Sequence, residues 1–345
     1  MRKQIHGGDV YRNKNVIDFS SNINPLGTPE SVIRSAAESL KDIACYPDVR
    51  MEKLVSALSG YENVPEEYIL CGNGAAELIF MLALAVRPGK ALLTAPAFAE
   101  YEQALLAADA EIDYLQLLPE NGFALQQDIL EKIRDDTDLV FLCNPNNPTG
   151  VCIDRDLLVR ILERCRVTGT ILAVDECFQD FLDPDDAFTL KPYLEEYENL
   201  FILKAFTKRY AMAGIRLGYA MTANAVLSER MLCCTQPWNV SIPAQAAGCA
   251  ALAETEYVEK GRMLVQKERA FLKGELKKLG LTVFDSRANY IFFRGRPHLS
   301  EALREHGILI RDCSNYRGLS DGYYRTAVRS HEENLKLIAA LTECI

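Results

Sequence analysis

A lysine and an arginine eight residues apart are the pair in this 345-residue sequence best suited to covalent chemistry. Lys208 follows an apolar run, residues 199–203, whose composition predicts a buried strand. A partly buried lysine beyond a strand end has a lowered pKa, and its free amine can condense with an aldehyde to form a Schiff base. Arg216 is spaced to hold an anion near that amine, while Gly214 and Gly218 let the backbone approach a flat ligand. A lone lysine is usually a solvated loop residue, so the hypothesis depends on further segments that suit the same ligand.

Polar and glycine residues follow other predicted strands as well. Gly74, Ala75 and Ala76 open a predicted helix, where unpaired N–H groups and the helix dipole favour an anion. Asn147 lies in the loop Asn-Pro-Asn-Asn-Pro-Thr-Gly directly after one strand, and Asp175 directly follows the next. Each feature has a commonplace alternative. The glycine-rich segment can be an ordinary helix start, the Asn-Pro loop a double-proline turn, and Asp175 a cap.

The arrangement of predicted strands explains why these residues would meet. Short apolar runs alternate with amphipathic helical segments, which predicts a largely parallel sheet covered on both faces. Ligands of such sheets bind at the carboxyl ends of the strands, where the candidate residues fall. The predicted strands cover residues 68–71, 91–94, 112–115, 138–142, 170–174 and 199–203.

Composition excludes several classes of function. The net charge of −10 disfavours binding to nucleic acid or to an anionic membrane, and no apolar run reaches the ~20 residues of a membrane helix. The eleven cysteines form no Cys-x-x-Cys pair, and the four histidines show no metal-ligand spacing. We therefore expect reduced thiols, a cytoplasmic location and no metal site.

The segment Thr207-Lys208, followed by Gly214-Ile215-Arg216-Leu217-Gly218, resembles the lysine segment of the fold-type I enzymes that use pyridoxal 5′-phosphate (PLP), the aspartate aminotransferase superfamily. The resemblance covers nearly the whole chain. It implies an α/β fold with a large domain, built on a mostly parallel seven-stranded sheet sandwiched by helices, and a small α+β domain. It also implies an N-terminal arm that forms part of the small domain over residues 1–45, the large PLP-binding domain over 46–250 and the small C-terminal domain over 251–345.

The resemblance assigns cofactor roles to individual residues. It implies that Lys208 carries the cofactor, that Asp175 pairs with the pyridine nitrogen and that Asn147 bonds the ring oxygen O3′. Ala205 departs from the pattern, because a hydroxyl residue that touches the phosphate is usual there. Tyr46 resembles a tyrosine that reaches the cofactor of a partner subunit, which implies a homodimer with shared sites. The remaining implied cofactor contacts are Gly74, Ala75, Ala76, Phe98, Phe178, Thr207 and Arg216.

Substrate residues follow from the same resemblance. Arg325 matches an arginine that binds the substrate α-carboxylate, and guanidinium suits this role because it pairs with both oxygens. Arg311, His6 and Asn24 resemble contacts to the phosphate of a small phosphorylated amino-acid substrate. Arg329 is open between a substrate contact and an exposed salt bridge.

Two reactions compete within this branch of the family. One is decarboxylation of L-threonine O-3-phosphate to aminopropanol phosphate in cobalamin biosynthesis, and the alternative is transamination of the histidinol-phosphate aminotransferase kind. The first is favoured by the entry segment with His6, by Phe178 where the aminotransferase prefers tyrosine, and by Arg329 where it usually has glycine. A regulatory, non-enzymatic role is disfavoured because the chain keeps Lys208 and has no basic helix-turn-helix stretch.

Overall fold

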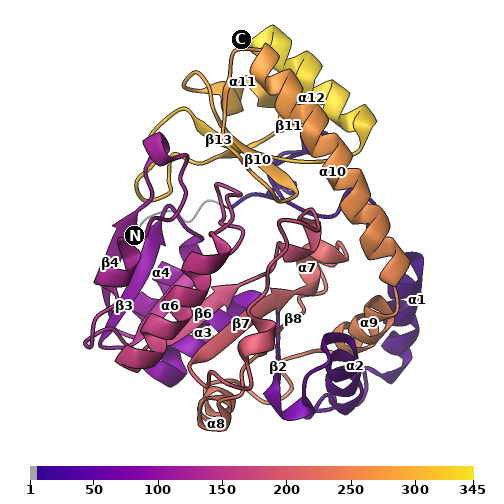
Figure 1. Cartoon of the computed structure of the whole chain (residues 1–345). Helices are drawn as coiled ribbons and strands as arrows, with labels where there is room; N and C mark the ends of the chain where they lie inside the picture. The colour runs from indigo at the N-terminus through magenta and orange to yellow at the C-terminus, as the bar shows by residue number, and fades with distance from the viewer. Residues whose placement is uncertain (1–5) are drawn as a thin grey trace.

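The computed structural model describes residues 6–345, and a seven-stranded sheet forms the centre of its larger part (Figure 1). The strand order is β2-β8-β7-β6-β5-β3-β4, with β8 antiparallel to both neighbours and the other pairs parallel. Every residue of β2, β5 and β8 is buried, because helices cover both faces of the sheet. The predicted fold class is confirmed. The strands are β2 (Ile69–Gly72), β3 (Lys90–Ala95), β4 (Glu111–Gln116), β5 (Leu139–Cys143), β6 (Ile171–Asp175), β7 (Leu200–Ala205) and β8 (Gly218–Met221).

Amphipathic helices connect these strands and pack against the sheet. Some begin with the side-chain caps that their sequences suggest: the carboxylate of Asp154 accepts from the N–H of Leu157 at 3.0 Å and so starts α6. The helices are α1 (Glu30–Ser39), α2 (Glu52–Glu62), α3 (Ala75–Val86), α4 (Ala99–Ala107), α5 (Ile129–Lys132), α6 (Arg155–Thr168), α7 (Phe206–Arg209), α8 (Ala225–Cys233) and α9 (Ile242–Leu252).

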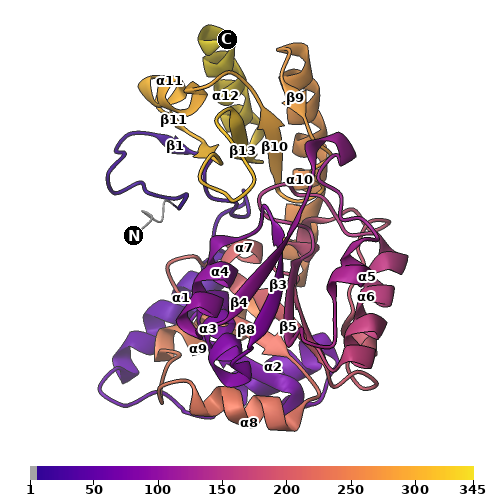
Figure 2. The same ribbon diagram turned by 90° about the vertical axis from the view of Figure 1, so that its left-hand side faces the viewer.

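The C-terminal part of the chain folds into a smaller unit with its own antiparallel sheet, in the order β12-β13-β10-β9 (Figure 2). The N-terminal segment joins it, because β1 (Ile17–Asp18) pairs in parallel with β11 (Ile308–Leu309). Phe19 is fully buried in the core of this unit. The other elements are β9 (Thr282–Val283), β10 (Tyr290–Arg294), β12 (Arg311–Asp312), β13 (Tyr323–Ala327), α10 (Thr255–Lys278), α11 (Leu299–Glu305) and α12 (His331–Cys344).

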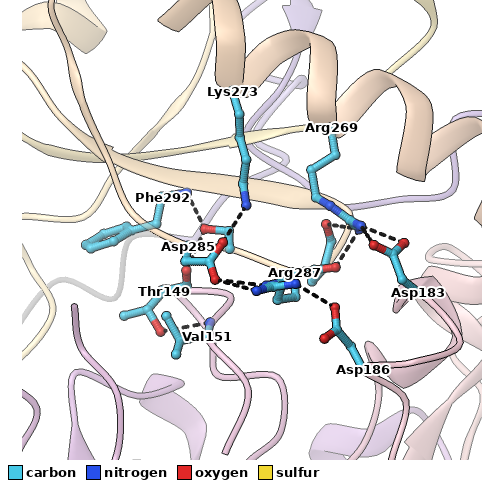
Figure 3. Close-up of polar contacts among 11 residues, drawn as sticks. Thr149, Val151, Asp183, Asp186, Arg269, Lys273, Asp285, Arg287 and Phe292 are labelled. Atoms are coloured by element: carbon cyan, nitrogen blue, oxygen red, sulfur yellow. Dashed lines mark hydrogen bonds and ion pairs between the residues drawn. The ribbon is translucent and has the colours of Figure 1, made fainter. Parts of the chain in front are cut away.

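Charged side chains join the small unit to loops of the large sheet (Figure 3). Arg269 on α10 donates two hydrogen bonds of 2.8 Å to the carboxylate of Asp183. Arg287, in the connection between β9 and β10, donates to Asp186 at 2.8 Å. The small sheet, with β12 and β13, is thereby fixed over the large one. The domain boundaries stay a prediction.

The long α10 connects the two parts along one side of the molecule (Figure 1). It is amphipathic, and its buried residues recur at helical spacing, as at Val265, Leu272 and Leu276. No helix within residues 6–345 has the combined length and apolar character needed to cross a bilayer.

Candidate active site

A cavity of about 1250 Å³ lies where the carboxyl ends of the parallel strands face the small sheet. Thr94 and Ala95 at the end of β3, Asp175 at the end of β6 and Ala205 at the end of β7 all line it. This is the edge at which open α/β sheets bind ligands. The predicted site residues that line the cavity are His6, Ala75, Ala76, Phe98, Asn147, Asp175, Phe178, Thr207, Lys208, Arg216, Arg311 and Arg325.

The start of α3 forms one wall of the cavity and suits a phosphate. Gly74 has φ 80°, and a Cβ there would lie 2.4 Å from the Arg216 guanidinium, so only glycine lets that side chain lie against the helix start. A Cβ on Gly218 would lie 2.5 Å from the backbone nitrogen of Ala75. No side chain caps this helix among the described residues, so its first N–H groups face the cavity together with the guanidinium. This set of donors fits a phosphate group.

Lys208 lies on the short α7, directly after β7, and is half-buried. Burial, followed by the positive charges of Arg325 and Arg216, lowers the pKa of its amine to about 8. A large share of this lysine is therefore neutral near pH 8, which is the form that condenses with an aldehyde.

Asp175 at the end of β6 is buried and held in place by two donors. The Tyr101 hydroxyl donates to Oδ2 at 2.5 Å, and the N–H of Cys177 donates to Oδ1 at 2.9 Å. Burial raises the pKa of this carboxyl, although both hydrogen bonds and the charge of Lys208 oppose that shift. A buried carboxylate in this position fits a cationic ring nitrogen, which would offset its desolvation.

Aromatic and amide groups complete the wall between these residues. Phe98, at the start of α4, lies edge-on to Tyr101 with ring centroids 5.6 Å apart, and Phe178 lies edge-on to Tyr290 at 5.0 Å. The Oδ1 atom of Asn147 accepts a hydrogen bond from Arg325. The flat apolar faces and the amide suit a planar heteroaromatic ligand.

Two arginines stand opposite each other on the small sheet above the cavity. Arg311 on β12 pairs directly with Arg325 on β13, and like charges opposite each other are unfavourable unless an anion joins them. Arg325 donates to the carbonyl of Ser20 at 2.8 Å, whereas its buried Nε finds no acceptor in residues 6–345. Arg311 donates to Oδ1 of Asn315 at 2.8 Å. This pair is suited to bind an anionic substrate.

His6 lies at the cavity edge, next to a carboxylate that the sequence did not single out. Its Nδ1 is 3.4 Å from Oε1 of Glu100, in the first turn of α4. Burial, and next the charge of Arg311, lower the pKa of this histidine.

Three predicted site residues are not among those that line the cavity: Gly74, which directly precedes the lining residue Ala75, and Asn24 and Tyr46. Asn24 is buried, and its amide donates to the carbonyl of Arg209 at 2.8 Å while its Oδ1 accepts from the N–H of Leu26. Asn24 does not line the cavity and each end of its amide bonds a backbone group, and its predicted phosphate contact stays a prediction. Tyr46 is 76% exposed and stacks on Trp238 with centroids 4.4 Å apart. Its role toward a partner subunit stays a prediction.

Arg329 does not line the cavity. It forms a 2.9 Å ion pair with Glu333 and donates to the carbonyl of Asp18 at 3.0 Å. The salt-bridge alternative is the one that the structure supports, and the arginine ties the N-terminal segment to α12.

Several cavity residues were missed by sequence reasoning. Asn22 lines the cavity, and its buried Oδ1 has no donor among the described residues. Glu100 and Cys177, which line the cavity, and Tyr101, which does not line it but donates to Asp175, gave no local signal, because residues of these types are common on helices and after strands. Asn22 stood two residues from the predicted Asn24 in an irregular segment whose spacing does not fix side-chain direction.

The fold and site together define a PLP-binding enzyme of the aminotransferase type. The model of the family "Aminotransferase class I and II" matches residues 14–341, so the chain belongs to this family of PLP-dependent enzymes.

Three proteins are similar to this chain over nearly its whole length. A threonine-phosphate decarboxylase of Salmonella typhimurium is 38% identical over 97% of this chain and 95% of its own length. An adenosylcobalamin biosynthesis bifunctional protein of Leptospira interrogans is 30% identical over 95% of this chain, which corresponds to 39% of that longer protein. The crystal structure of a histidinol-phosphate aminotransferase from Clostridium acetobutylicum superposes with a TM-score of 0.87 at 32% identity, covering 94% of this chain and 98% of that one.

Proposed function

We propose that this chain decarboxylates L-threonine O-3-phosphate to aminopropanol phosphate, as a step of cobalamin biosynthesis. The observation that carries the proposal is the placement of His6, Arg311 and Arg325 in the same cavity as Lys208. A substrate with a carboxylate and a phosphate on either side of its amine would satisfy these cationic groups. The similarity to the decarboxylase and to the cobalamin biosynthesis protein supports the same reaction and pathway.

The residues of the cavity fit PLP in charge and shape. When bound, PLP supplies an electron sink for the bond that breaks at Cα. The start of α3 and Arg216 match its phosphate, and Asp175 matches its ring nitrogen. The residues that would hold it are Gly74, Ala75, Ala76, Phe98, Asn147, Asp175, Phe178, Thr207, Lys208 and Arg216.

The chain's own groups orient the bond that breaks. Arg325 would pair with the substrate carboxylate, since its Nε is buried and lacks an acceptor within residues 6–345. Asn147 holds the Arg325 guanidinium from the large domain, which fixes the direction of that carboxylate. The bond between the carboxyl carbon and Cα breaks, CO₂ leaves, and a proton must replace it at Cα. Lys208 Nζ, with its pKa lowered to about 8, can carry this proton.

A homodimer in the cytoplasm is also proposed. Tyr46 and Trp238 form an exposed aromatic stack, and Ile43 and Val49 nearby in the sequence are also more than half exposed. Exposed apolar side chains of this kind are typical of interfaces. The substitution Tyr46→Ala should weaken self-association, which analytical ultracentrifugation measures. An unchanged dimer with unchanged cofactor affinity would refute the role of Tyr46.

A paired assay on PLP-loaded protein tests the reaction. One sample receives L-threonine O-3-phosphate, and CO₂ and the amine product are followed. The other receives histidinol phosphate with 2-oxoglutarate, and glutamate is followed. CO₂ release without any keto acid supports decarboxylation, whereas glutamate formation without CO₂ would make the chain an aminotransferase.

A further inference from the structure

Glu100 is a largely buried carboxylate within the cavity that the cofactor and carboxylate contacts leave unused. It lies in the first turn of α4 (Ala99–Ala107), and its side chain is 15% exposed. Its Oε1 is 3.4 Å from Nδ1 of His6, whereas its buried Oε2 has no hydrogen-bond partner anywhere in residues 6–345. A buried carboxylate oxygen without a donor is costly, and this one borders the part of the cavity reached by His6 and Arg311. It is thus ready to interact with a ligand.

The charges around Glu100 come from five parts of the fold. Burial is the main cause that raises the pKa of its carboxyl to about 7, and Lys208 and Arg311 oppose that rise. On α4 itself, Glu102 is occupied at 2.5 Å by Arg317. The titratable or charged groups that face Glu100 are His6 of the N-terminal segment, Asp175 of β6, Lys208 of α7, Arg311 of β12 and Tyr316 of the following loop.

We propose that Glu100 makes the pocket of His6 and Arg311 selective for a phosphate monoester over a carboxylate, by sharing one proton with the bound phosphate. The inference rests on the proposed function for the presence of a phosphate on the substrate. Glu100 acts as a specificity-determining residue, and no covalent bond changes: one proton is taken up from solvent when the ligand binds.

The preference follows from relative basicity. A phosphate monoester has a second pKa of about 6, whereas a carboxylate has a pKa of about 4. The phosphate and Glu100 therefore hold a proton with similar strength, and a single proton between them removes their repulsion and gives Oε2 its missing partner. A terminal carboxylate on the ligand holds a proton much less well, so two negative carboxylates would face each other in a buried site.

Binding of two matched ligands to the PLP-loaded protein tests this mechanism. 3-Phosphoglycerate and L-malate both carry a carboxylate and a 2-hydroxyl group, and they differ in having a phosphate monoester or a second carboxylate at the other end. Neither has an amine, so neither reacts. Titration calorimetry at pH 7.5 in buffers of different ionisation enthalpy gives both Kd and the number of protons taken up.

Wild type is expected to take up a substantial fraction of a proton with 3-phosphoglycerate, because about three quarters of Glu100 is ionised at pH 7.5 when its pKa is about 7. Glu100→Gln should lower this uptake by at least about half a proton and tighten L-malate binding roughly tenfold, the equivalent of one pKa unit. Glu111→Gln, at an exposed position on β4, is the matched control and should change neither value.

Equal proton uptake by wild type and Glu100→Gln would overturn the proposal, and so would unchanged discrimination between the two ligands. Should Glu100→Gln fail to fold or to retain PLP absorbance, wild type alone decides: phosphoglycerate binding without proton uptake between pH 7 and 8 refutes the mechanism. These outcomes do not depend on CO₂ release. Loss of the decarboxylase assignment with intact proton uptake would therefore leave Glu100 as the phosphate selector of a different reaction.

Discussion

Tyr101→Phe should destabilise the cofactor-free protein through one buried hydrogen bond. Tyr101 is fully buried and donates to Asp175 at 2.5 Å, and its ring stacks on Phe141 with centroids 5.0 Å apart. Phenylalanine keeps the stacking and removes only the donor, so Oδ2 of Asp175 loses its partner. Hydrogen bonds to charged groups contribute about 1.5–3 kcal/mol, and we expect a loss of about 2 kcal/mol in the free energy of unfolding. For a chain of 345 residues this corresponds to a fall of about 3 °C in Tm.

The stability that Tyr101→Phe loses, measured as the free energy of unfolding, should also depend on pH. Burial raises the pKa of Asp175 in the folded state, so ionising this group opposes folding as pH rises through that folded pKa. The Tyr101 hydroxyl stabilises the ionised form, and its removal raises the folded pKa further. The stability difference between wild type and Tyr101→Phe should therefore be smaller at pH 5 than at pH 8.

Urea unfolding followed by near-UV circular dichroism at both pH values provides the measurement. Tyr197→Phe is the matched control, because the Tyr197 hydroxyl donates at 3.1 Å to Glu163, whose side chain is 41% exposed. That variant should lose less than about 0.5 kcal/mol at either pH. Equal losses in the two variants, or a Tyr101→Phe effect that shrinks with rising pH, would refute the reasoning.

Four further outcomes are expected. The rate at which cofactor-free protein takes up PLP should rise as pH increases through about 8, where Lys208 loses its proton, and Arg325→Gln should move this profile to higher pH because a lowering charge is removed; an unmoved profile would contradict the electrostatic account. Gly74→Ala should weaken PLP binding at least tenfold in an equilibrium dialysis titration, because its Cβ would displace Arg216, while Gly274→Ala, with open space around it, should leave binding unchanged. Asp183→Asn should lower stability by about 2 kcal/mol in thermal unfolding, since it breaks the paired contact with Arg269 shown in Figure 3, and the exposed Asp185→Asn should have little effect. Phe178→Tyr should change the cofactor absorbance or the rate of CO₂ release, and identical spectra and rates would mean that the missing hydroxyl does not discriminate between the two reactions.

Residues that directly follow predicted strands were identified from the sequence alone. Asp175, Asn147 and Lys208 all lie at strand ends that the apolar runs had marked, and the parallel arrangement of those strands places their ends at one edge. The glycine at the start of α3 was readable for the same reason, since a helix that begins there presents its N–H groups to that edge. Local patterns therefore predicted which side chains gather at this edge of the sheet, because period and strand order set its geometry, while their roles toward the cofactor came from the family resemblance and stay predictions.

The substrate half depended on tertiary structure. His6 meets Glu100 only because the N-terminal segment folds back toward α4 of the large part, and Arg311 stands opposite Arg325 because β12 and β13 pair within the small sheet. Spacing could not show that Asn22, and not Asn24, lines the cavity, since irregular backbone has no period that fixes side-chain direction. The pKa of Glu100, and with it the proposed selection of phosphate, is set chiefly by burial, which is a property of the packed molecule and of no short stretch of its sequence.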